Sequence, residues 1–150
     1  MSLITDIKSI IATLYPDATL ILSSKFKANL TSFNIDAADL PLVVIDNEQP
    51  KDSDIKKNNN VHKDTRIIIS FLYLDSKENS DEQTNTLIEQ AEAMADRVAV
   101  NIYQLLTVRP EGNQAYKITP MFHVFSTDLS GVALEIRVNY QQIVRFSLNQ

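Results

Sequence analysis

The side chains that could bind a metal ion or act as nucleophiles are few in this chain of 150 residues. There is no cysteine, and the only histidines are His62 and His123. Neither histidine has another histidine or a carboxylate at the short, regular spacing that zinc sites use. The sequence therefore predicts no metal site and no thiol chemistry.

Two acidic pairs, Asp52/Asp54 and Asp81/Glu82, are the candidates for acid–base catalysis by paired carboxylates. The first pair lies near lysines in a polar segment. The second suits the first turn of a helix, where the helix dipole favours carboxylates. A hydrolase with a Ser-His-Asp site assembled from distant residues is a further alternative, although no nucleophile-elbow motif is present. We expect no catalytic residue and no enzymatic activity.

The chain contains two glycines, Gly112 and Gly131, which are far apart. Loops that cradle phosphate groups need glycines because the backbone must approach the ligand closely and adopt positive φ. A nucleotide site of the Walker or Rossmann type is therefore not expected, and no cofactor is predicted.

The charge distribution argues against a generic nucleic-acid binder, which needs a concentrated basic face. The net charge is -5 at pH 7. The one basic cluster has no interleaved aromatic residues of the kind that stack on bases; it comprises Lys56, Lys57, Lys63 and Arg66. This cluster could contact an acidic neighbouring subunit or a nucleic acid strand, or it could be an ordinary solvated loop.

The clearest structural pattern is the stretch 116–140, which predicts two strands joined by a turn at 126–131. From residue 132 to 140 apolar residues occupy every even position, and the odd positions after Ala133 are polar. Such alternation gives a strand one buried and one exposed face. The rest of the chain is expected to cover the buried face.

Three further strands are predicted at 19–22, 40–46 and 66–75, where apolar and β-branched residues are concentrated. The last of these is apolar on both faces. Such a strand is either covered on both faces or lies at a contact between subunits.

Two helices are predicted from apolar residues at helical spacing. The first, 3–14, ends before Pro16. The second, 81–106, follows a capping box that runs from Ser80 to Gln83. It would be about 39 Å long at ~1.5 Å per residue, which is long enough to cross the whole sheet.

The segment 47–64 is almost wholly polar and is interpreted as a long loop, either a projecting functional arm or a mobile segment. Together the elements predict one α+β domain spanning residues 1–150. It would consist of a mainly antiparallel sheet with a short N-terminal helix and one long helix packed on one face.

The scarcity of catalytic groups favours a protein that works through its surface. The polar segment 47–64, the strand after it and the exposed face of the hairpin supply the candidate contacts with a subunit or partner. Two of them, Met121 and Phe125, are apolar residues on an otherwise polar hairpin face. The candidates are Lys56, Lys57, His62, Lys63, Arg66, Met121, Phe125 and Arg137.

No targeting or spanning segment is expected. The first residues lack the basic start and unbroken apolar core of a signal peptide. No apolar run approaches the roughly 20 residues that a spanning helix needs. We therefore expect a chain that is made in a cytoplasm and is kept or assembled there.

The order of elements resembles the small tail terminator and tail completion (neck) proteins of tailed bacteriophages. The hairpin carries most of this resemblance, through the strand 118–125, the turn 128–131 and the strand 132–140. The long helix with Asp96-Arg97 in its middle also fits. In element order the resemblance covers nearly the whole chain.

The resemblance implies a structural virion protein, assembled in the host cytoplasm, that forms a homo-oligomeric ring, commonly six-fold, where the tail tube meets the neck. Its partners would be further copies of itself, the tail tube and the neck or head-connector proteins. Nucleic acid would be close only through the lumen of the ring, and no membrane would be involved. The alternative is a small, soluble, monomeric or dimeric binding or adaptor protein without catalysis.

Overall fold

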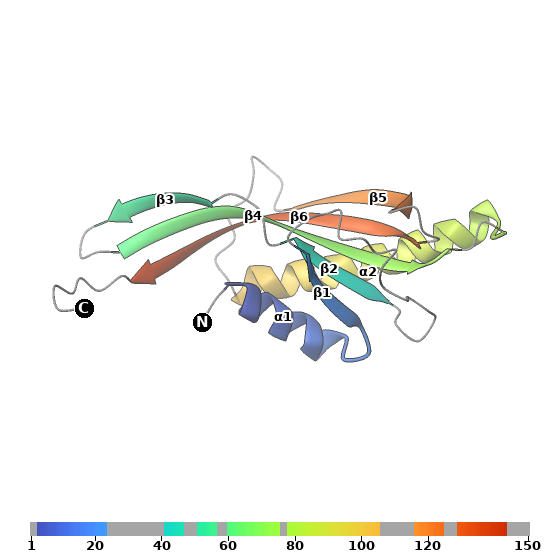
Figure 1. Cartoon of the computed structure of the whole chain (residues 1–150), viewed down its shortest axis with the longest axis horizontal. Coiled ribbons are helices and arrows are strands. Elements are labelled where there is room, and N and C mark those ends of the chain that lie inside the picture. The colour runs from blue at the N-terminus through green and yellow to red at the C-terminus, as the bar shows by residue number, and fades with distance from the viewer. Residues whose placement is uncertain are drawn as a thin grey trace.

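The computed structural model describes residues 3–23, 41–46, 51–56, 60–75, 78–105, 116–124 and 129–143. The chain forms two helices and a six-stranded sheet (Figure 1). In order, the elements are α1 (Leu3–Leu14), β1 (Thr19–Ser23), β2 (Leu42–Asp46), β3 (Lys51–Lys56), β4 (Asn60–Leu74), α2 (Asp81–Leu105), β5 (Tyr116–Val124) and β6 (Leu129–Ile143). The predicted α+β class is confirmed, as are both predicted helices.

The sheet is built around β4 and β6, which pair along the full 15 residues of each strand. The strand order is β1-β2-β4-β6-β5, and only the β1–β2 pair is parallel. β2 pairs with 68–72 of β4, and β3 pairs with 60–65 of β4. β2 and β3 therefore follow one another along the same edge of β4, opposite the edge that β6 occupies.

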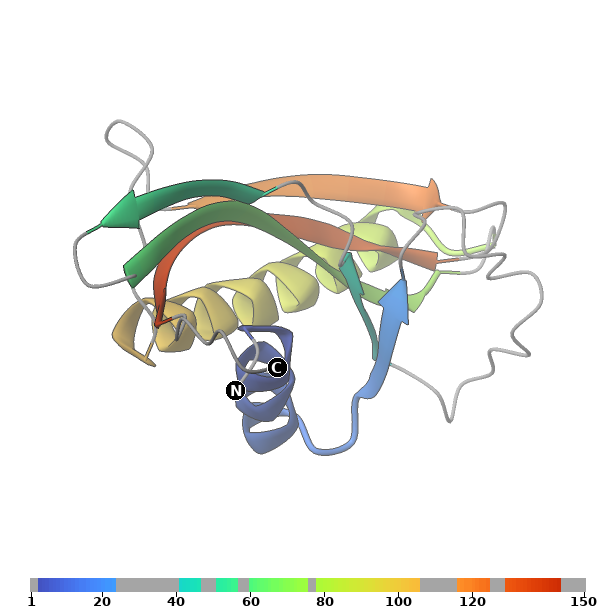
Figure 2. The ribbon, with the colours of Figure 1, turned by 60° about the vertical axis from the view of Figure 1, so that its left-hand side comes forward.

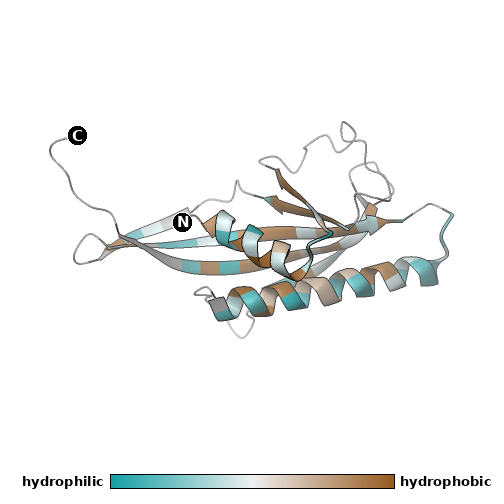
Figure 3. Cartoon of the chain, turned by 90° about the horizontal axis from the view of Figure 1, so that it is seen from below, coloured by the Kyte–Doolittle hydropathy of each residue, from teal (hydrophilic) through white to brown (hydrophobic). Residues whose placement is uncertain are grey.

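Both helices lie against the same face of the sheet (Figure 3). The alternation predicted in the hairpin is confirmed, because Val132, Leu134, Ile136 and Val138 of β6 are each at most 1% exposed. They pack with residues of α1, α2, β2 and β4 in the main hydrophobic core. Burial of apolar surface at about 25 cal/mol per Å² makes this face the main source of stability.

The strand that was predicted to be apolar on both faces contributes to two clusters. Ile67, Ile69 and Phe71 of β4 belong to the main core. On the opposite face Leu72 is fully buried in a smaller cluster with residues of β2 and β6, against which Ile21 and Met121 pack. On the second apolar face of β4, Leu72 is therefore covered by other residues of the same chain, whereas Leu74 is 46% exposed.

The prediction of a loop over 47–64 is wrong for the described part of that segment. Residues 51–56 form β3, which pairs with 60–65 of β4 and thereby extends the sheet. The hydrophobic pattern misses this hairpin because each of its two strands contains a single apolar residue and so shows no alternation. Its strands are held by backbone hydrogen bonds rather than by a buried apolar face.

The predicted capping box starts α2 as expected. The backbone N–H of Gln83 donates to Ser80 Oγ at 3.2 Å, and the backbone N–H of Ser80 donates to Gln83 Oε1 at 2.7 Å. Each bond satisfies a donor that the first turn of the helix would otherwise leave without a partner.

Replacing the cap, Ser80→Ala, should lower the free energy of unfolding by about 1 kcal/mol. Denaturant unfolding measures this directly. Ser80→Asp, which keeps an acceptor at the cap, should recover most of the loss, and equal stability of Ser80→Ala and wild type would contradict the capping role.

The Asp96-Arg97 pair in the middle of α2 connects the helix to two other elements. Tyr116 of β5 donates its hydroxyl hydrogen bond to Asp96 Oδ1 at 2.7 Å. Arg97 places its guanidinium over the ring of Tyr15, just beyond α1, at 5.6 Å from the ring centroid. These two contacts fix the edge strand β5 and the end of α1 to the long helix.

The hydrogen bond to Asp96, with a smaller contribution from burial, raises the pKa of Tyr116 to about 12. Because the folded-state pKa lies above the ordinary value of 10.0, the fold favours the protonated phenol. This contribution to stability is complete below pH 10 and is lost as the pH rises through about 12.

Tyr116→Phe should therefore cost about 1 kcal/mol at neutral pH. The free energy of unfolding of the wild type should fall between pH 10 and 12, and that of Tyr116→Phe should fall less over the same range. Denaturant unfolding at several pH values measures both. A variant with the same alkaline profile as the wild type would contradict the assignment.

No helix in the described part of the chain is both long and apolar enough to cross a membrane. Within the same residues, no three histidine, aspartate or glutamate side chains are grouped so that they could hold a metal ion.

Candidate subunit interface

Three of the eight predicted contact residues, Lys56, His62 and Lys63, lie in one projection of the sheet, and Arg66 and Arg137 lie at its base. We define the arm as β3 together with 60–65 of β4 and 138–143 of β6, which the strand registers place side by side. Viewed along two perpendicular directions, the arm extends past the ends of both helices (Figures 1 and 3). Figure 2 shows the strands of the arm curving continuously out of the central sheet.

The arm exists because β4 and β6 are unusually long. Each would span about 50 Å at ~3.3 Å per residue, whereas strands of five or six residues are most common. The buried part of the core ends at Thr65 and Val138, which are 4% and 0% exposed. Beyond this point the sheet continues without helical cover, so the extra length does not serve the core.

Two residues of the basic cluster predicted from the sequence, Lys63 and Arg66, lie on opposite faces of the sheet. Side chains alternate along a strand, so Lys63 lies on the same face as Ile67, which belongs to the core under the helices. Arg66 lies on the opposite face, where it is paired with Glu135. Lys63 and Arg66 therefore do not share one patch, because β4 includes the position of Lys63, which the sequence prediction had assigned to a loop that precedes the strand.

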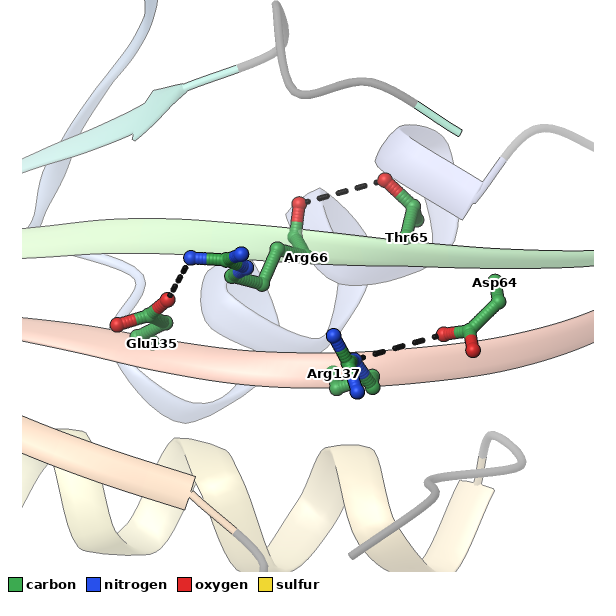
Figure 4. Close-up of polar contacts among 5 residues, drawn as sticks. All are labelled: Asp64, Thr65, Arg66, Glu135 and Arg137. Carbon is green, nitrogen blue, oxygen red and sulfur yellow. Dashed lines mark hydrogen bonds and ion pairs between the residues drawn. The ribbon is translucent and has the colours of Figure 1, made fainter. Parts of the chain in front are cut away.

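Four charged side chains form a network on the face that the helices do not cover (Figure 4). Arg66 donates from Nη1 to Glu135 Oε1 at 2.8 Å. Arg137 forms an ion pair with Asp64, with Nε and Oδ1 3.8 Å apart. The two arginines are direct cross-strand partners, and each carboxylate lies diagonally across the β4–β6 pair from its arginine.

This arrangement relieves the repulsion that two directly opposed arginines would otherwise experience. The side chains are 21–51% exposed, so each pair is worth less than about 1 kcal/mol to folding. The network carries no net charge and its arginines already have carboxylate partners. It is consequently a poor site for binding a free anion and is better suited to a polar contact with a protein.

The remaining predicted contact residues are distributed as follows. Lys56 ends β3 opposite Asn60, and His62 of β4 lies opposite Asp54 and Gln141. Met121 is separate from the arm: it lies in β5 opposite Gly131 and packs, half-buried, against the smaller core cluster. Lys57 and Phe125 lie outside the described residues.

Two apolar residues of the arm are not among the contacts predicted from the sequence. Ile55 is 76% exposed and lies opposite half-buried Val61, so the arm carries an apolar pair near its tip. Their signal in the sequence is faint, since each is a single apolar residue in a polar segment. Only the register between β3 and β4 reveals that they are neighbours.

A further missed residue is Asp75, which is fully buried at the end of β4. Its carboxylate accepts hydrogen bonds from Ser130 Oγ at 2.7 Å, Thr84 Oγ1 at 2.9 Å and Asn79 Nδ2 at 2.9 Å. These donors come from β6, from α2 and from the turn that precedes α2. Asp75 thus ties together three elements, and its saturated contacts indicate a structural role.

Comparison with known proteins leaves the family of the chain open. No protein-family model matches it, and a search of curated proteins gives no match either.

Proposed function

We propose that this chain is a structural subunit of a tailed bacteriophage, similar to tail terminator and tail completion proteins, that assembles into a homo-oligomeric ring where the tail tube meets the neck. Its work would be done by protein–protein contacts. The observation that carries the proposal is the arm, a three-stranded extension beyond the helices that contributes little to the core.

A projecting ribbon of strands such as the arm is unfavourable unless another protein surface covers it. A narrow ribbon of strands is only marginally stable in water by itself, and an exposed strand edge invites pairing with other chains. Here the ribbon is stabilised by its continuity with the central sheet through β4 and β6. A ring subunit uses such a projection to reach its neighbour or the tube.

The alternative is a small binding or adaptor protein that uses the arm to hold a different partner. Deletion of residues 52–60 separates the two functions, because it removes most of β3 and the start of β4 while leaving the core strands intact. A ring subunit should still fold after the deletion but lose its assembly. An adaptor should keep its oligomeric state.

The role itself can be tested on particles. An antibody against the chain should label the head-proximal end of the tail in tailed phage particles whose genome encodes it, as seen by immunogold electron microscopy. Particles made with the 52–60 deletion should lack the label and show unfinished tails. Label that is absent from intact particles, or that lies elsewhere on them, would contradict the proposal.

A further inference from the structure

The strand β5 lies at the edge of the sheet, and among the described strands it has a neighbour, β6, on one side only (Figure 1). An exposed strand edge presents backbone N–H and C=O groups that invite pairing with other chains. β5 is nine residues long and rich in β-branched and aromatic residues, which favour strand pairing. Its free edge would therefore pair readily with another strand unless something in β5 opposes it.

A proline occupies the middle of this strand. Pro120 lies opposite Val132 of β6. A proline has no N–H to donate, so in a sheet it occupies edge strands, at positions where the missing N–H would point away from the neighbouring strand. Backbone groups in an antiparallel strand alternate between its two edges. The backbone nitrogens of Pro120, Ile118 and Tyr116 therefore all point to the free edge.

Packing does not explain a proline at this position. Tyr116 and Ile118 lie on the same face of β5 as Pro120 and pack against the main core, whereas Pro120 is exposed. The strand also continues past it to Val124, so it does not form a turn. The other described prolines, Pro16 and Pro41, lie in connections between elements.

The effect of Pro120 is clearest when two copies of β5 are placed edge to edge. In an antiparallel pair centred on Ile118, Ile118 would face its own copy, and Tyr116 of each strand would face Pro120 of the other. Each of these outer pairs would lack the bond that residue 120 should donate, and the proline ring would crowd the neighbouring strand. Exposed Lys117 adds a charge that further disfavours pairing at an edge.

We propose that Pro120 prevents the free edge of β5 from pairing with β5 of a second copy of this chain, so that the sheet of each subunit ends at β5. The proposal is independent of the proposed function, because it concerns a contact that is avoided both by a ring subunit and by an adaptor. The described strands of the arm contain no proline.

Pro120→Thr tests the proposal because it returns the missing N–H to the free edge. A strand edge that pairs with its own copy makes a self-complementary contact, which joins assemblies two by two. The mass measured by light scattering should therefore be about twice that of the wild type at the same concentration, or more. Hydrogen exchange of the Ile118 amide should slow by about tenfold or more, because this N–H becomes bonded.

The matched control is Thr119→Val, which makes the same strand more apolar and raises its β-propensity. Thr119 is exposed, and its backbone N–H points toward β6, so this variant leaves the free edge as it is. Its mass should equal that of the wild type. Pro120→Val should behave like Pro120→Thr, and unchanged slow exchange of the β6 amides that pair with β4 identifies the variants that keep the fold.

Two results would overturn the proposal. One is that the folded Pro120→Thr and Pro120→Val variants have the mass and the Ile118 exchange rate of the wild type. The other is that Thr119→Val associates as strongly as they do, because association would then follow apolar character rather than the restored N–H. Either result would leave the ring role untouched, since that role is tested by the label on tails and by the 52–60 deletion.

Discussion

Gly131→Ala should be the most damaging conservative substitution in the sheet, lowering the free energy of unfolding by about 3 kcal/mol or more. Gly131 is buried in β6 between Leu72 of β4 and Met121 of β5. A Cβ atom there would overlap the carbonyl oxygen and carbon of Phe71 and would lie 3.0 Å from Leu72 Cα. These are backbone atoms of the central strand, so relief requires the β4–β6 pair to move apart.

The matched control is Ala133→Ser, which adds one atom to the next residue on the same face of β6, where the side chain is only half-buried. Its cost should stay within about 1 kcal/mol. In thermal unfolding, Gly131→Ala should lower the melting temperature by about 6–12 °C for a chain of this size. Equal melting temperatures for the two variants would show that the β4–β6 spacing is not as close as described.

Asp75→Ala should have an effect of similar size, about 3–4 kcal/mol. The substitution removes a buried carboxylate that accepts hydrogen bonds from Ser130, Thr84 and Asn79. The Ser130 hydroxyl, fully buried, would lose its hydrogen bond to Asp75, and removing a buried hydrogen-bond partner costs about 1–3 kcal/mol. Losing the charge-assisted bonds accounts for the rest.

Asp81→Ala provides the comparison for Asp75→Ala. Asp81 is an exposed carboxylate in the first turn of α2, and its removal should cost less than about 1 kcal/mol. Denaturant unfolding of both variants, with hydrogen exchange at the start of α2, measures the difference. If Asp75→Ala lowered the free energy of unfolding no more than Asp81→Ala does, the hydrogen bonds of the buried carboxylate would not be what holds β4, β6 and α2 together.

Those elements that carry a local signal were predictable from the sequence. The capping box at Ser80 and the apolar stripe after it define α2, and the even-numbered apolar residues of β6 define its buried face. In each case the signal lies within one element. It is either a side chain that caps the backbone of its own helix, or a spacing of apolar residues that places them all on one buried face.

What could not be predicted depends on register between distant segments. β3 has no hydrophobic alternation, and its strand character comes from its backbone pairing with β4. The contact between Arg66 and Glu135 joins residues 69 positions apart, and the bond from Ser130 to Asp75 joins residues 55 apart. Lys63 and Arg66 lie on opposite faces because both belong to β4 and side chains alternate along a strand. This could not be predicted while residue 63 was assigned to a loop.

The proposed function requires that this chain assembles with itself into a ring. The most direct test is negative-stain electron microscopy of the purified protein, with its mass measured by light scattering at the same concentration. We expect annular particles with a central hole and a mass that is several times the 16.9 kDa of one chain. Compact particles with the mass of a single chain, even at the highest concentration reached, would contradict it.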